Sequence, residues 1–191
     1  MKKKGFTLVE LLAVIAILAI LVIVAMPNVL GMFNQAKSST FITEVQEYMS
    51  TATSQFMQDA LLSQGSALYY GNGNATGTTL KTLNMSGGEK YYFIEMDRNG
   101  NFKRVVIADK NYCYDSNLAK DPADGTTKPL DKFAKTDILL SDLWEVADED
   151  ISPIGSNTSG YKAVDVTGID ATSKRPIVAG CKAETPAVQP E

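Results

Sequence analysis

The sequence contains no histidine and only two cysteines among its 191 residues. Histidine is the commonest general base and a frequent metal ligand, so its absence removes Ser-His-Asp and Cys-His catalytic arrangements. The two cysteines, Cys113 and Cys181, form no C-x-x-C pair and do not have the spacing of zinc ligands. These absences argue against an enzyme and lead us to expect no metal site and no cofactor.

Basic residues are also few, with 18 Lys and Arg against 22 Asp and Glu. Three of the 18 are the lysines at positions 2–4, and without them the balance is 15 basic to 22 acidic residues. An acidic chain is a poor partner for the phosphate backbone of nucleic acids. We therefore expect no direct nucleic-acid binding.

What the sequence does contain is one long apolar run near its N-terminus. Residues 6–26 read FTLVELLAVIAILAILVIVAM, with Glu10 as the only charge, and Pro27 follows. As a helix this run would span about 31 Å, the thickness of one bilayer core. A carboxylate in such a span costs on the order of 2.5–3.5 kcal/mol, so Glu10 requires a partner. The lysines before the run predict a cytoplasmic N-terminus, with the rest of the chain outside the membrane.

The start of the chain resembles the N-terminal motif of the type IV pilins and their pseudopilin relatives. The segment that carries the resemblance is KGFTLVE, residues 4–10, directly followed by the apolar helix. The resemblance implies that a prepilin peptidase cleaves the Gly5–Phe6 bond, removes residues 1–5 and methylates the new amine of Phe6. It also implies an assembly role for Glu10, which lies one helical turn from Phe6 and could pair with that amine in its own or a neighbouring subunit.

Two other interpretations of this segment were open. A secretory signal peptide ends at small residues, whereas residues 26–29 read Met-Pro-Asn-Val. A plain single-pass anchor remains possible but leaves Glu10 and the Gly5–Phe6 step unexplained. The chain departs from the family at Ala19, where many pilins have glycine.

The apolar run is expected to continue as a helix to about residue 64, with Gly65 as its stop. Pro27 and Gly31 predict a kink. Residues 28–64 form an amphipathic continuation, in which the part from Val45 onward packs on the globular domain. For residues 29–41 a contact between helices in a filament is equally plausible. The predicted apolar stripe comprises Val29, Phe33, Ala36, Phe41, Val45, Met49, Ala52, Phe56 and Ala60.

Residues 65–191 predict an exported globular domain, which makes the chain α+β: a long helix packed against an antiparallel sheet, as in the type IV pilin fold. Residues 65–88 are expected to be a loop, and residues 90–96 and 102–108 a hairpin around the turn 97–101. A short helix is expected from Thr136 or Asp137 to Ala147. Further strands are predicted at residues 112–114, 161–167 and 176–181, and a frayed tail at 183–191.

A disulfide between Cys113 and Cys181 is favoured in an exported domain, the alternative being two buried thiols. The resemblance agrees, because many family pilins bracket their C-terminal region with one disulfide. Trp144 is expected to be a core anchor rather than an adhesive surface residue. A calcium site is disfavoured, since the acidic residues that could form one follow no EF-hand spacing: Asp121, Asp124, Asp148, Glu149 and Asp150.

The function that the resemblance implies is structural, namely a subunit of a type IV pilus and most simply its major pilin, serving adhesion or motility. The alternatives are a pseudopilin of a type II secretion or competence system and a minor tip pilin that acts as a binding module. The expected partners are other copies of the chain, the prepilin peptidase, the inner-membrane assembly platform and the lipid bilayer. The expected location is the cell membrane before assembly and a surface filament afterwards.

Overall fold

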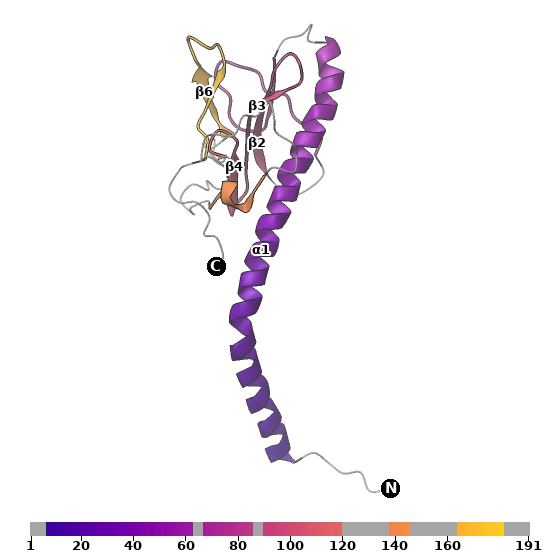
Figure 1. Ribbon diagram of the computed structural model, residues 1–191, viewed down its shortest axis with the longest axis vertical. Coiled ribbons are helices and arrows are strands. Elements are labelled where there is room, and N and C mark those ends of the chain that lie inside the picture. The colour runs from indigo at the N-terminus through magenta and orange to yellow at the C-terminus, as the bar shows by residue number, and fades with distance from the viewer. Residues whose placement is uncertain (1–6, 63–66, 86–89, 120–137, 146–163, 182–191) are drawn as a thin grey trace. The chain divides into compact units, whose positions relative to one another are not determined.

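The computed structural model describes residues 7–62, 67–85, 90–119, 138–145 and 164–181. The chain divides into two compact units, Met1–Lys37 and Ser38–Gln189. Helix α1, Leu8–Leu62, begins in the first unit and ends in the second (Figure 1). The described part of α1 ends at Leu62, and the predicted end at residue 64 lies outside the described residues together with Gly65.

Within the first unit, α1 is an exposed apolar helix. Every residue from Leu8 to Met26 is exposed. The helix runs without interruption through Pro27 and Gly31, so the missing N–H of the proline does not end it. The predicted kink at these two residues stays a prediction.

Within the second unit, α1 buries the C-terminal part of the predicted apolar stripe. Its buried members are Phe41, Val45, Met49, Ala52 and Phe56. Tyr48, which the predicted stripe omitted, is also buried, and its ring lies 5.0 Å from that of Tyr92. Burial raises the pKa of Tyr48 to about 12, with smaller contributions from Tyr92 and nearby glutamates. The earlier members Val29, Phe33 and Ala36 are exposed.

The second unit contains a five-stranded antiparallel sheet, in the order β1-β2-β3-β4-β5. The predicted hairpin is confirmed, and its turn places Gly100 at φ +82°, a conformation that glycine adopts without steric cost. The α+β, pilin-like arrangement is therefore present. The strands are β1 Leu68–Gly71, β2 Tyr91–Met96, β3 Phe102–Ala108, β4 Tyr112–Asp115 and β5 Leu143–Glu145.

Two predictions about the sheet were wrong. The predicted loop at 65–88 contains strand β1, because Leu68 and Tyr70 are buried when this segment pairs with β2. The predicted helix through Trp144 is instead a 3₁₀ turn, Leu140–Asp142, followed by strand β5. A short apolar run has no periodicity that separates helix from strand, and here pairing with β4 decides the outcome.

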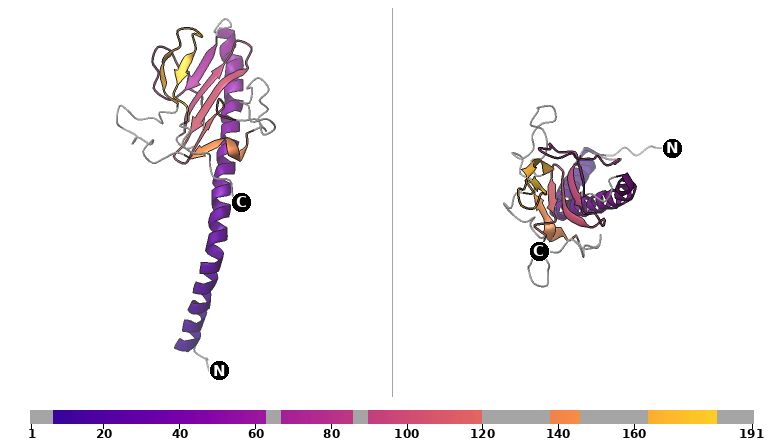
Figure 2. Two further views of the ribbon diagram at one scale, coloured as in Figure 1. Left: turned by 60° about the vertical axis from the view of Figure 1, so that its left-hand side comes forward. Right: turned by 90° about the horizontal axis from the view of Figure 1, so that it is seen from above.

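Both faces of the five-stranded sheet are covered, which accounts for the almost continuous burial of β2 and of the last four residues of β3. Side chains alternate between the faces with a period of two. Tyr92, Ile94 and Ile107 belong to a helix-side cluster with α1, whereas Phe93 and Val106 belong to a hairpin-side cluster with the C-terminal strands. Figure 2 shows the sheet between α1 and the C-terminal hairpin.

The C-terminal hairpin consists of β6, Val166–Ile169, and β7, Pro176–Val178. The predicted strand 161–167 overlaps β6 only at Val166 and Thr167, and β6 extends two residues beyond the predicted end. The predicted strand 176–181 is present over its first three residues as β7. Strand β6 begins five residues after Tyr161, the predicted start. Residues 161–163 lie outside the described residues. The hairpin contributes Val166 and Val178 to the hairpin-side cluster, and Val164 joins them just before β6.

Candidate functional site

The first described residue, Thr7, and Glu10 form a reciprocal cap on the N-terminus of α1. The Thr7 backbone N–H and hydroxyl both donate to Glu10 Oε2, each at 2.8 Å. In return, the Glu10 backbone N–H donates to Thr7 Oγ1 at 3.3 Å. This is the capping box that the pattern Thr-x-x-Glu predicts, and such caps contribute about 0.5–2 kcal/mol to a helix.

The cap explains how a carboxylate is tolerated at the start of an apolar helix. Glu10 lies in the first turn, where the exposed N–H groups of the helix favour negative charge. Its carboxylate also accepts two hydrogen bonds from Thr7 of the same chain, so it has partners without a second chain. Sequence analysis identified Glu10 but missed Thr7, although the Thr-x-x-Glu spacing was the signal that could have found it.

Beyond the cap lies a segment suited to a membrane by length and composition. Leu8–Met26 comprises 19 residues with a mean hydropathy of 3.2, and none of it is buried. At 1.5 Å per residue it is about 28 Å long, close to a bilayer core. A soluble core helix would bury such a surface within its own domain, so this surface is built to meet lipid or other protein.

Comparison with known proteins agrees with the geometry of this end of the chain. Residues 1–26 match the family described as the prokaryotic N-terminal methylation motif. The chain begins as a type IV pilin-like prepilin. No curated protein and no solved structure matches the chain significantly.

The prepilin motif gives the N-terminal residues their context. Gly5 and Phe6, the predicted cleavage and methylation sites, lie outside the described residues. Glu10 is described, and the structure places its carboxylate against the N–H of the residue that directly follows Phe6. The apolar helix of the prepilin fits membrane anchoring before assembly.

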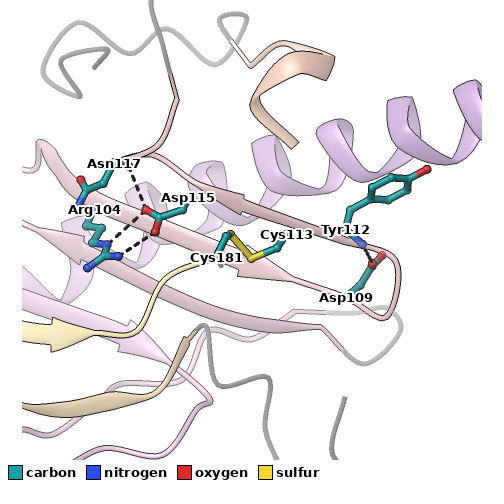
Figure 3. Close-up of a disulfide and its surroundings, with 7 residues drawn as sticks. All are labelled: Arg104, Asp109, Tyr112, Cys113, Asp115, Asn117 and Cys181. Carbon is teal, nitrogen blue, oxygen red and sulfur yellow. Dashed lines mark hydrogen bonds and ion pairs between the residues drawn. A yellow bond between two sulfur atoms is a disulfide. The ribbon is translucent and has the colours of Figure 1, made fainter. Parts of the chain in front are cut away.

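A second group of interactions lies on the far side of the sheet from α1, around a disulfide. Cys113 on β4 is joined to Cys181, which follows β7, so the bond links the five-stranded sheet to the segment after the hairpin (Figure 3). Beside it, Arg104 Nη2 lies 2.8 Å from Asp115 Oδ2, and Arg104 Nη1 donates to the backbone oxygen of Val178 at 3.1 Å. The carboxylate of Asp115 is buried, so this pair is largely shielded from solvent.

A further ion pair attaches the hairpin to the sheet. Arg175 donates to Glu95 on β2 through two parallel bonds, Nε–Oε1 at 2.7 Å and Nη2–Oε2 at 2.8 Å. The Glu95 side chain is 5 % exposed and the Arg175 side chain 46 %. The hydrogen bonds to Glu95 raise the pKa of Arg175, with burial acting in the opposite direction. Sequence analysis did not pair these residues, because 80 positions separate them.

The remaining candidates contribute less. The acidic residues considered for calcium lie outside the described residues, and the described part of the chain contains no group of three potential metal ligands. Trp144 packs against the hairpin-side cluster but is only partly buried, so it serves as a core residue at the edge of the sheet.

Proposed function

We propose that this chain is the major pilin of a type IV pilus, a structural subunit that polymerises through its N-terminal helix into a surface filament for adhesion or motility. The observation that supports this most is the capped, wholly exposed apolar helix with a single acidic residue, which carries a prepilin motif. An anchor alone would not need that residue. A subunit that must pass from lipid into a helical bundle would use it.

In this proposal the chain has four functional segments. Residues 1–5 are the leader that the prepilin peptidase removes, and residues 6–27 are the membrane span that later forms the filament core. Residues 28–64 continue the helix, and residues 65–191 form the exported domain. The partners are the peptidase, the inner-membrane assembly platform, the bilayer before assembly, and other copies of the chain afterwards.

The proximity of Glu10 to the cleavage site suggests how assembly would be driven. Thr7 N–H lies 2.8 Å from the Glu10 carboxylate. Cleavage would create an amine on the residue immediately before Thr7, and an adjacent residue is within a few ångströms (about 3.8 Å between Cα atoms). Glu10 could therefore pair with the amine of its own chain in the membrane and with that of a neighbour in the filament, where an unpaired charge is costly.

Three variants separate the charge of Glu10 from its capping role. Glu10→Gln keeps an oxygen that can accept from Thr7 but loses the charge, and Glu10→Leu loses both. Thr7→Ala removes the two hydroxyl bonds of the cap but retains the charge and the backbone N–H that donates to Glu10. If charge pairing drives assembly, Glu10→Gln and Glu10→Leu should reach the membrane at normal levels and fail to form filaments. Thr7→Ala should still assemble.

The readout is the amount of the chain in filaments sheared from the cell surface, together with mass spectrometry of its N-terminus. A major pilin should dominate the sheared material and begin with a methylated Phe6. Normal filaments from Glu10→Gln would refute the charge-pairing role. Absence of the wild-type chain from sheared filaments would refute the major-pilin proposal and favour a pseudopilin, whereas a trace amount would favour a minor tip pilin.

A further inference from the structure

The sequence contains two Asn-Gly steps, Asn72–Gly73 and Asn99–Gly100. In such a step the glycine nitrogen can reach the asparagine side-chain carbon with little obstruction, because glycine has no side chain and an unusually free backbone. By sequence the two steps are chemically equivalent. The structure gives them different surroundings, which should make their reactivities differ.

Asn72 is held by hydrogen bonds on both sides of its amide group. Its Nδ2 donates to the backbone oxygen of Lys90 at 2.7 Å, and its Oδ1 accepts from the backbone N–H of Tyr92 at 2.8 Å. The Asn72 backbone N–H also donates to the oxygen of Tyr92 at 3.2 Å. Gly73 is crowded as well, since a Cβ added there would lie 2.8 Å from the oxygen of Val164. Rotating the Asn72 side chain toward the nitrogen of Gly73 would break two good hydrogen bonds.

Asn99 lies at the tip of the β2–β3 turn and is exposed. Its backbone N–H donates to Asp97 Oδ1 at 2.8 Å, but within the described part of the chain its side-chain amide makes no hydrogen bond. The next residue, Gly100, is anchored by a single bond from its N–H to the oxygen of Asp97, at 3.1 Å. Breaking the hydrogen bond from Gly100 to Asp97 therefore frees the Gly100 nitrogen to approach the Asn99 side chain.

We propose that Asn99 is a site of spontaneous deamidation in the folded protein and that Asn72 is protected from it. The Gly100 nitrogen, having lost its proton to water, bonds to Asn99 Cγ. The Cγ–Nδ2 bond breaks, ammonia leaves, and a five-membered succinimide forms. Water then adds to one of the two ring carbonyls and opens the ring to aspartate or isoaspartate, with no change of oxidation state.

The two products act differently on the turn. Aspartate at position 99 places a second carboxylate beside Asp97, in a turn that already collects backbone donors around one carboxylate. Isoaspartate adds one methylene to the backbone just before Gly100. Gly100 lies so close to the Phe56 ring of α1 that an added Cβ would be 3.1 Å from it. The isoaspartate form should therefore loosen the turn from α1, whereas the aspartate form changes mainly its charge.

The test uses the full-length chain in detergent, aged at mildly alkaline pH and sampled over time. Trypsin cuts after Arg98 and Lys103, so the peptide 99–103 contains Asn99 together with Asn101, and the peptide 38–81 contains Asn72 together with Asn74. Fragmentation of each peptide therefore assigns the converted residue. Mass spectrometry follows the conversion of amide to carboxyl, and an isoaspartyl methyltransferase assay detects the isoaspartate product. Because two hydrogen bonds restrain Asn72, conversion at Asn99 should be faster by about tenfold or more.

A parallel sample, reduced and unfolded in guanidinium chloride, serves as the control, and there the two steps should react at similar rates. The variant Asn99→Gln should abolish conversion at position 99, because glutamine forms the corresponding ring much more slowly. The proposal is overturned if Asn72 reacts as fast as Asn99 in the folded protein. It is equally overturned if Asn99 reacts only after unfolding, since the Gly100–Asp97 bond would then be protective.

Discussion

Removing the disulfide should destabilise the globular domain by several kcal/mol. Cys113 and Cys181 are separated by 68 residues, and both are buried in the hairpin-side cluster. Closing a loop of about 70 residues in the unfolded chain corresponds to roughly 4 kcal/mol in the chain-entropy model. The variant with both Cys113→Ala and Cys181→Ala avoids leaving a free thiol that could join two chains, so it is the preferred perturbation.

The expected loss can be converted into a melting temperature. For a domain of this size, about 1 kcal/mol corresponds to about 2–4 °C, so the double variant should melt about 10 °C lower. The chain has a single tryptophan, Trp144, and it pairs directly with Cys113 across β4 and β5. Its fluorescence therefore reports on the part of the domain that the disulfide holds, without a contribution from the N-terminal part of α1.

Reductant provides the matched control. It should lower the melting temperature of the wild-type protein by a similar amount and leave that of the double variant unchanged. A melting temperature less than about 2 °C lower in the double variant would refute the reasoning. It would mean that closing the loop in the unfolded chain does not stabilise the domain by the amount worked out above. A reductant effect on the double variant would show that the reagent acts elsewhere.

Two further predictions concern charged groups of the domain. Arg175→Gln should cost about 1–3 kcal/mol in chemical denaturation, because it leaves the buried carboxylate of Glu95 without its ionic partner, whereas the exposed neighbour Lys174→Gln should be nearly neutral. Burial raises the pKa of Asp97, but hydrogen bonds from Asn101 and the rest of its turn outweigh this and hold the pKa below its ordinary value of 3.8. The stability that this depressed pKa contributes is present above 3.8 and is lost as the pH falls through the folded-state value. Asp97→Asn should therefore reduce the loss of stability as the pH falls from about 3.8 through the folded-state value, and an unchanged pH profile there would contradict the assignment.

The sequence was sufficient to predict the elements that depend on local pattern. The apolar helix, the buried stripe from Phe41 to Phe56 and the β2–β3 hairpin all follow from periodicity and turn residues that lie close together in the chain. Glu10 could be selected because a lone charge in an apolar run requires an explanation. Thr7 was missed only because the capping pattern was not applied to it.

Other features depend on contacts that no local pattern contains. The segment 143–145 is a strand because β4 offers it a partner, although its apolar residues also fit a short helix. The pairing of Glu95 with Arg175 joins residues 80 positions apart, and a buried glutamate within a strand gives no sign of where its arginine will come from. The burial of both faces of the sheet likewise becomes apparent only when the hairpin is in place.

The C-terminal hairpin needs these long-range links because its own strands are too short to hold it. Strands of four and three residues form a two-stranded sheet that would be marginal in isolation. If the hairpin left the sheet, Phe93 and Val106 would be exposed and Glu95 would lose its ionic partner. The disulfide and the Arg175–Glu95 ion pair act on the hairpin through different chemistry, since the first is a covalent bond that reduction breaks and the second is an electrostatic contact. Because the two links are independent, the loss of one leaves the other to hold the hairpin against the second apolar face of the sheet.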